Sequence, residues 1–159
     1  MKITIIAVGN LKEQFLKECS MEYQKRISKF SRMEIIEIPE EKLSEKASQK
    51  NILDCLEKEE EKIKSKVNPS SFVIELSLEG SELTSEEFSS MIEKITVDGY
   101  SSITFIIGSS HGLGKGIKDI ANYRLKISKM TFPHQLARVI LLEQIYRGFK
   151  ILNGEPYHK

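Results

Sequence analysis

Residues 103–116 read ITFIIGSSHGLGKG, a run of five apolar or β-branched residues followed by a glycine-rich segment. A short run of this composition is typical of a strand buried on both faces of a parallel sheet. The glycines predict a loop at the carboxyl end of that strand, where a flat ligand can approach the backbone closely. An ordinary glycine-rich turn would have the same sequence.

Outward from this segment, short strand-like runs alternate with longer stretches of helical period. Further strands are predicted at 2–8, 33–38, 72–78 and 123–128, and helices over 15–30, 42–66, 84–97 and 133–152. This alternation predicts an α/β fold, with a mostly parallel sheet and helices on both of its faces. Ligands of such sheets bind beyond the carboxyl ends of the strands, which here are 76–80, 108–112 and 127–132.

The composition is that of one soluble globular domain spanning 1–159, with 40% hydrophobic and 30% charged residues. The apolar run at 139–142 is far shorter than the ~20 residues that a membrane span needs. Cys19 and Cys55 have neither metal-ligand spacing nor the pattern of a disulfide framework. We therefore expect a cytoplasmic protein with no metal site and no membrane segment.

Charge is distributed unevenly along the chain, although the net charge is only +1. From residue 111 to the C-terminus there are nine Lys and Arg against three Asp and Glu. A basic region of this kind favours a polyanionic partner such as a nucleic acid, although charges can also scatter unevenly by chance. The dense charges of 42–66 are typical of a solvated helix face.

The last predicted helix is apolar around most of its circumference. Its apolar residues are Leu136, Val139, Ile140, Leu141, Leu142, Ile145, Tyr146, Phe149 and Leu152. A helix of this kind must be buried on several sides. A homodimer interface would bury the extra face and is the interpretation we favour; a central core helix is the alternative.

The glycine-rich segment does not match either common nucleotide-binding motif. A P-loop would need a glycine at Ser109 and a hydroxyl residue at Gly116. The dinucleotide pattern that starts at Gly112 meets Ile117 where its last glycine should be. Neither motif therefore predicts a phosphate-binding site.

Polar residues gather at the C-terminal end. Glu143 and Arg147 are four residues apart, so they share one helix face and can pair. Tyr157 and His158 close the chain together with a lysine, a combination that could stack on and clamp a nucleotide base. A frayed terminus without a role is the simpler alternative.

Two C-terminal segments carry a resemblance to a known family: ISKMTFPHQLARVILLEQIYR at 127–147 and GEPYHK at 154–159. They resemble the H-type ribosomal RNA large-subunit methyltransferases of the SPOUT superfamily, which methylate N3 of a pseudouridine in 23S ribosomal RNA. The segments MKITIIAVGNLK, FVIELSLEG and FIIGSSHGL fit as well, so the resemblance covers essentially the whole chain. Family members usually carry a second glycine where this chain has Ser109, which leaves the backbone approach there open.

The resemblance implies a C-terminal trefoil knot, which general rules of chain connectivity would not have predicted. It also implies S-adenosylmethionine as cofactor, bound by the knot loops, and a homodimer that completes each site. Carried over by position, the cofactor-binding residues are Leu76, Gly108, Ile127, Ser128, Lys129, Met130, Thr131 and Phe132. These positions coincide with the three strand ends that the sheet pattern had already indicated.

By the same resemblance, the catalytic candidates are Glu143, Arg147, Tyr157 and His158, with the tail folding over the partner chain's cofactor site. The N3 proton of pseudouridine must leave during methyl transfer, so a base and a cation near the developing charge would help. We assign proton handling to His158 or Glu143, RNA or charge contact to Arg147, and base stacking to Tyr157.

The expected substrate is ribosomal RNA within the assembled ribosome, because the chain shows no separate RNA-binding domain and the dimer is nearly neutral overall. Two other functions remain open. One is a non-enzymatic factor that binds S-adenosylmethionine or a nucleotide and docks on the ribosome. The other is a small α/β enzyme that acts on a free nucleotide.

Overall fold

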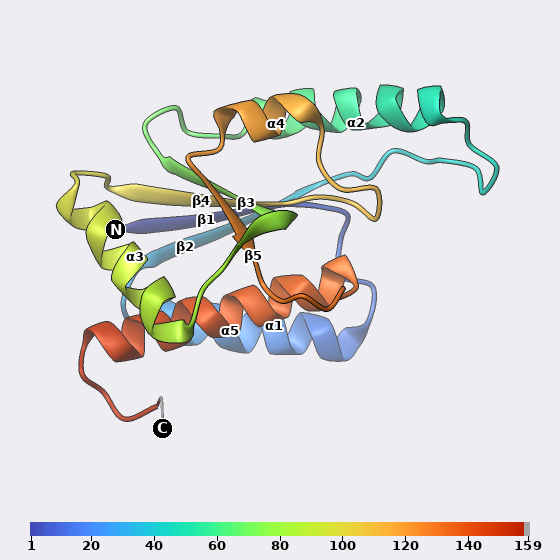
Figure 1. Cartoon of the computed structure of the whole chain (residues 1–159). Helices are drawn as coiled ribbons and strands as arrows, with labels where there is room; N and C mark the ends of the chain where they lie inside the picture. The colour runs from blue at the N-terminus through green and yellow to red at the C-terminus, as the bar shows by residue number, and fades with distance from the viewer. Residues whose placement is uncertain (158–159) are drawn as a thin grey trace.

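A five-stranded sheet in the order β2-β1-β4-β3-β5 organises the computed structural model, which describes residues 1–157 (Figure 1). The strands are β1 (Lys2–Val8), β2 (Arg32–Ile38), β3 (Phe72–Glu82), β4 (Ser102–Ile107) and β5 (Tyr123–Lys126). All four neighbouring pairs are parallel, so the predicted sheet is confirmed and is wholly rather than mostly parallel. The carboxyl ends of all strands therefore lie at one edge of the sheet.

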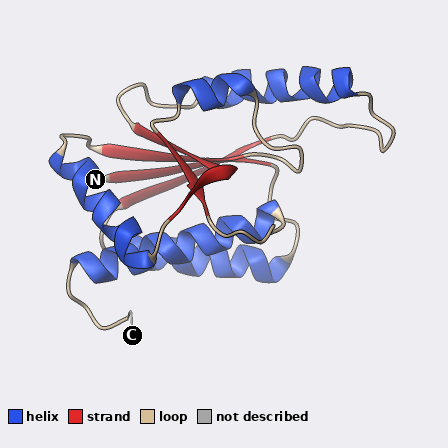
Figure 2. Ribbon diagram, viewed as in Figure 1, coloured by secondary structure: helices blue, strands red, loops and turns tan. Residues whose placement is uncertain are grey.

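Helices cover both faces of the sheet, as predicted (Figure 2). They are α1 (Gln14–Ile27), α2 (Gln49–Lys64), α3 (Ser85–Val97), α4 (Lys115–Ile120) and α5 (His134–Leu152). In Figure 1, α1, α3 and α5 lie on one face, and α2 and α4 lie on the other. Phe105 of β4 and Leu142 of α5 belong to the larger core on the first face, whereas Ile63 and Ile117 belong to the core under α2 and α4.

The burial of each strand follows its position in the sheet. Every residue of the central strand β4 is buried, which agrees with the uniformly apolar run in its sequence. The edge strand β2 instead mixes exposed and buried positions. The parallel register pairs Ile5 with Phe105 across β1 and β4, so large apolar side chains lie side by side in the centre of the sheet.

Helix α5 is enclosed within the chain itself. It packs against both α1 and α3, and Val139, Leu142 and Ile145 on it are buried. Much of its apolar circumference is therefore explained by a central core position, the alternative to a dimer interface. Residues such as Leu136, which is 38% exposed, remain only partly covered. The homodimer and the trefoil knot remain predictions.

Several element boundaries differ from the sequence-based expectation, and one helix was not expected. Helix α1 ends at Ile27 rather than at 30, and β5 ends at Lys126 rather than at 128. Helix α2 begins at Gln49 rather than at 42, because the Ser48 hydroxyl accepts a hydrogen bond from the Asn51 amide and caps the helix there. Strand β3 extends to Glu82, with a shift in its register against β5 between Leu76 and Ser81. Helix α4 was not expected, because a six-residue helix after several glycines gives little periodic signal.

One apolar residue was assigned to the wrong side of its helix. The helical spacing of Phe15, Cys19, Tyr23, Ile27 and Phe30 predicts that they share one face of the first helix. Phe15 is nevertheless 66% exposed, whereas its neighbour Leu16 is buried. One step along a helix rotates the side chain by about 100°, so a stripe judged from spacing alone can be off by one residue at its start. Among the described residues, no helix is both long and apolar enough to span a membrane.

The sequence Thr84-Ser-Glu-Glu87 has the spacing of a capping box and so predicts a helix start, which the beginning of α3 confirms. The Thr84 hydroxyl accepts a hydrogen bond from the Glu87 amide at 3.2 Å, and the Glu87 carboxylate accepts one from the Thr84 amide at 2.7 Å. Two amide groups that would lack partners at the helix start are thereby satisfied. At the other end, Gly99 adopts a φ of +93°, which ends the helix at the predicted position.

We expect Thr84→Ala to lower the free energy of unfolding by about 1 kcal/mol, because the Glu87 amide loses its acceptor. Chemical denaturation followed by circular dichroism measures this change. Thr84→Ser is the matched control, since it keeps the hydroxyl and should stay close to the wild-type value. Equal stability of the alanine and serine variants would show that the cap contributes little.

Candidate active site

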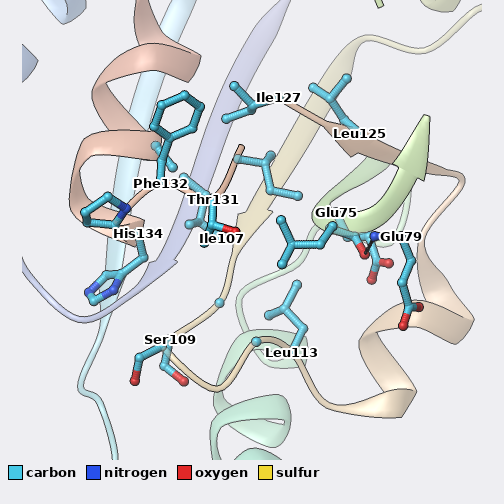
Figure 3. Close-up of a pocket in the computed structure, with 18 of the residues that line it drawn as sticks. Glu75, Glu79, Ile107, Ser109, Leu113, Leu125, Ile127, Thr131, Phe132 and His134 are labelled. Atoms are coloured by element: carbon cyan, nitrogen blue, oxygen red, sulfur yellow. Dashed lines mark hydrogen bonds between the residues drawn. The ribbon is translucent and has the colours of Figure 1, made fainter. Parts of the chain in front are cut away.

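A cavity of about 630 Å³ opens where the carboxyl ends of β3 and β4 meet the segment that follows β5 (Figure 3). All three of the strand ends predicted to hold a ligand contribute to its wall, at 75–79, 107–113 and 125–134. The prediction that these separate segments meet at one edge of the sheet is therefore confirmed. The volume of the cavity lies in the range of ordinary small-molecule sites, about 300–1,000 Å³.

Seven of the eight expected cofactor residues line this cavity. They are Leu76, Gly108, Ile127, Ser128, Met130, Thr131 and Phe132. The eighth, Lys129, is exposed and is not among the lining residues. Figure 3 shows Ile127 and Phe132 extending from the segment after β5, near Leu125 and Ile107. The cavity thus has largely apolar walls, and the assignment of these residues to a cofactor remains a prediction.

The loop after β4 folds tightly at the mouth of the cavity. A Cβ at Gly108 would lie 2.3 Å from the Gly112 carbonyl oxygen, so no larger residue fits at this position without a backbone shift. Gly112 itself has a φ of +86°, which favours glycine. Its amide donates to the Ser109 carbonyl at 3.0 Å, which closes the turn.

Ser109, where the resemblance predicts a glycine, is buried and hydrogen-bonded to α2. Its hydroxyl donates to a carboxylate oxygen of Glu59 at 3.2 Å. The extra hydroxyl is therefore accommodated by a neighbouring helix. The charged stretch 42–66 was expected to be a solvated face, and for Glu59, which is 4% exposed, that expectation is wrong.

Three of the four catalytic candidates form a cluster on and beside α5. The Arg147 guanidinium donates to the Glu143 carboxylate at 2.6 Å, and the Tyr157 hydroxyl donates to the same oxygen at 3.3 Å. The guanidinium carbon also lies 4.8 Å from the centre of the Tyr157 ring. The predicted pairing of Glu143 with Arg147 is confirmed, and Tyr157 packs back against the helix. His158 lies outside the described residues.

Tyr23 of α1 borders the same cluster. Burial, together with a hydrogen bond to Tyr157 and the nearby charge of Glu143, raises the pKa of Tyr23 to about 12. Glu143 also raises the pKa of Arg147 by accepting its hydrogen bond, so the guanidinium stays charged at neutral pH. The cluster therefore presents the Arg147–Glu143 pair beside the neutral phenol of Tyr23.

Within one chain this cluster does not reach the cavity. Of the candidates in the described chain, Glu143, Arg147 and Tyr157 are not among the residues that line it. His134 and Ala137 of α5 do line it, and Glu143 lies six residues beyond Ala137, about 9 Å along the helix axis. In Figure 1, α5 runs from the strand ends back toward the opposite side of the sheet.

A charged group lies at one end of the cavity, which sequence reasoning missed. The Glu75 carboxylate is fully buried, lies 3.2 Å from the Arg124 guanidinium and makes no hydrogen bond. Lys118 of α4 pairs with Glu79 nearby, at 3.3 Å. Burial raises the pKa of Glu75, and the charges of Arg124 and Lys118 offset this only in part.

Sequence reasoning also missed His134 and Glu59, which lie beside the candidate residues. His134 follows the segment 127–132 after a single proline, so its position at the start of the last helix could have indicated a place in the wall. Glu75 follows the apolar run Phe72–Ile74 and precedes Leu76, so its charge marks it as unusual, although the sequence does not indicate its partner. Glu59 gives no such signal, because it is one of several glutamates in its helix.

A family model described as "Predicted SPOUT methyltransferase" matches residues 1–158. The putative ribosomal RNA large subunit methyltransferase H of Methanococcus maripaludis is 53% identical, over the full length of both chains. The ribosomal RNA large subunit methyltransferase H 1 of Clostridium perfringens is 52% identical, again over the full length of both. This chain belongs to the SPOUT methyltransferase family. The family expected from the sequence is thereby confirmed.

The fold agrees with that of a solved methyltransferase. A putative methyltransferase from Legionella pneumophila, solved in complex with the bound cofactor SAM, superposes with a TM-score of 0.50 at 9% identity. The match covers 91% of this chain and 65% of that one. At such low identity the comparison supports the fold alone. Among the described residues, no group of His, Cys, Asp and Glu side chains is placed to hold a metal ion.

We expect Glu75→Gln to raise the melting temperature at pH 7, because the amide avoids the cost of burying an ionised carboxyl. The folded-state pKa of Glu75 is raised, so wild type binds a proton there as the pH falls toward that pKa. The advantage of the variant should therefore shrink in acid. Melting curves of both proteins between pH 4.5 and pH 8 measure this difference.

Glu79→Gln is the control for that experiment, because the Glu79 side chain is 69% exposed and its removal changes no buried charge. Arg124, with a side chain that is 44% exposed, stays hydrated when Glu75 is replaced. A Glu75→Gln protein less stable than wild type at every pH would mean that the Arg124 ion pair outweighs the cost of burial.

Proposed function

We propose that the chain transfers a methyl group from S-adenosylmethionine to N3 of a pseudouridine in 23S ribosomal RNA. The observation that carries the proposal is that seven of the eight residues expected to bind the cofactor line the same cavity. The names of its full-length relatives, which are large-subunit ribosomal RNA methyltransferases, support the same class of substrate. The predicted trefoil knot and a cytoplasmic location belong to the same proposal.

The cavity fits this cofactor in size and in chemistry. Apolar side chains such as Ile107, Leu125 and Ile127 form walls on which an adenine ring can pack. The tight turn at Gly108 brings backbone groups to the surface, where they can hydrogen-bond a ligand. S-adenosylmethionine, when bound, supplies an activated methyl group on its sulfonium. The chain's own task is then to orient that group toward the base.

The cluster on α5 has the groups that the second half of the reaction needs. Arg147 can stabilise the negative charge that develops as the N3 proton leaves, and its pairing with Glu143 fixes its orientation. The ring of Tyr157 offers a face for stacking on a base. Glu143 or His158 would accept the proton.

A homodimer would bring the two halves together. The cluster of one chain does not line that chain's own cavity and begins about 9 Å along α5 from Ala137, the nearest lining residue on that helix. A second chain related by two-fold symmetry can place its cluster over the first chain's cavity, and the reverse contact follows from the symmetry. Each of two composite sites would then take its cofactor from one chain and its catalytic groups from the other.

The assembled ribosome is the proposed substrate. The C-terminal portion holds nine Lys and Arg, which two chains would present together to RNA phosphates. The described chain is filled by a single sheet and its helices, with no separate RNA-binding module. Recognition would then depend on the shape of the folded particle across a wide contact surface.

Transfer of a labelled methyl group from S-adenosylmethionine to ribosomes that lack this modification tests the function directly. We expect label on one large-subunit pseudouridine, located by nuclease mapping, and little label on a short isolated RNA hairpin. Cofactor binding without transfer would instead indicate a ribosome-binding factor. Label on free nucleotides without ribosomes would indicate a small-molecule enzyme.

Mixing two inactive variants tests the composite site. Gly108→Ala should weaken cofactor binding at least ~10-fold, since its Cβ would collide with the Gly112 carbonyl, and Arg147→Ala should abolish transfer while cofactor still binds. After subunit exchange in equal amounts, half the dimers are mixed and each holds one intact site, so activity should return to about a quarter of wild type. No recovery, with exchange shown by mass spectrometry, would place both residues in one chain's site.

A further inference from the structure

The segment Ser109–His111 separates two cavities. It lines the proposed cofactor cavity on one side and a second cavity of about 420 Å³ on the other. The second cavity is bounded by α2 and by the segment 40–43. A strip of backbone with open space on both sides has few packing contacts to fix it. Its position therefore depends on the hydrogen bonds that anchor it.

The Glu59 side chain of α2 is such an anchor. One of its carboxylate oxygens accepts a hydrogen bond from the Ser109 hydroxyl at 3.2 Å, and the other accepts one from the Glu41 amide at 2.9 Å. Glu59 is only 4% exposed, whereas Glu57 and Glu61 on the same helix are exposed. Burying a carboxylate carries a cost unless both oxygens find donors, and here both do.

The next residue along α2 anchors the far end of the same connection. The Glu60 carboxylate accepts a hydrogen bond from the Gly116 amide at 2.8 Å, at the start of α4, and pairs with Lys64 at 2.6 Å. Two consecutive glutamates thus hold the chain between β4 and α4 at both ends. Figure 1 shows α2 and α4 side by side above the sheet, in agreement with this contact.

We propose that Glu59 is a positioning residue for the cofactor, holding the strip Ser109–His111 in the conformation that completes the cavity wall. This inference rests on the proposed function, because it takes the 630 Å³ cavity as the S-adenosylmethionine site. Glu59 itself does not line that cavity, so it acts through Ser109. Loss of this hydrogen bond lets the strip Ser109–His111 move into the second cavity. Cofactor binding must then order the strip again, which lowers the affinity.

A positioning role differs from a merely structural one in what the variants do to binding. A residue that only stabilised the fold would lower the melting temperature when replaced, but the molecules still folded would bind the cofactor as before. A positioning residue changes the dissociation constant of the folded protein. Glutamine at position 59 can satisfy both partners, because its carbonyl accepts from the Glu41 amide and its amide donates to the Ser109 hydroxyl.

Isothermal titration of S-adenosylmethionine into the full-length protein, well below its melting temperature, provides the test. For Glu59→Ala we expect the dissociation constant to rise roughly 10-fold, the effect of losing one hydrogen bond to a charged group. Glu59→Gln should stay within about 3-fold of wild type. Glu57→Ala is the matched control on the exposed side of α2 and should bind as wild type does.

Ser109→Ala removes the same hydrogen bond without disturbing α2, and so covers the case in which Glu59→Ala does not fold. Ser109→Ala should also weaken cofactor binding. The two single variants remove the same hydrogen bond. The dissociation constant of the Glu59→Ala/Ser109→Ala double variant should therefore rise by less than the product of the two single fold-changes. Wild-type affinity in Glu59→Ala and Ser109→Ala would overturn the inference while leaving the proposed function intact. A wild-type chain that binds no S-adenosylmethionine would overturn the proposed function, and this inference with it.

Discussion

The parallel pairing of β3 with β4 on one side and with β5 on the other is the constraint on which the site depends. Parallel strands end at the same edge of a sheet, so three segments far apart in the chain meet there. The apolar side chains of these strands pack into the cores on both faces of the sheet, and this packing fixes the position of the strand ends. The loops above it are then free to differ in sequence, and they carry the residues that surround the cavity.

The strands and most helices follow from the local sequence. Short runs of apolar and β-branched residues predicted β1 and β4, and the Thr84–Glu87 spacing predicted the start of α3. These signals were sufficient because each one lies within a few residues of the element that it predicts. The start of α2 and the short α4 were missed, since a helix rich in charge has no sharp apolar boundary and six residues show no clear period.

The site was predicted less evenly than the fold. The strand-end rule located the three wall segments, and the resemblance named residues within them, of which Lys129 alone does not line the cavity. Glu59 and Glu75 could not be assigned from the sequence, because their importance comes from partners 50 and 49 residues away, Ser109 and Arg124. Such long-range pairings depend on the tertiary fold, which no local pattern encodes.

Because Ser109 and Glu59 share a hydrogen bond, the residue at one position restricts which residues the other can hold. A glycine at 109 would leave one oxygen of the buried carboxylate without a donor, at a cost of about 1–3 kcal/mol. A chain that acquires glycine there is therefore under pressure to replace the glutamate at 59 by a smaller or neutral residue. The two positions should therefore change as a pair, although they lie on the loop after β4 and on a distant helix.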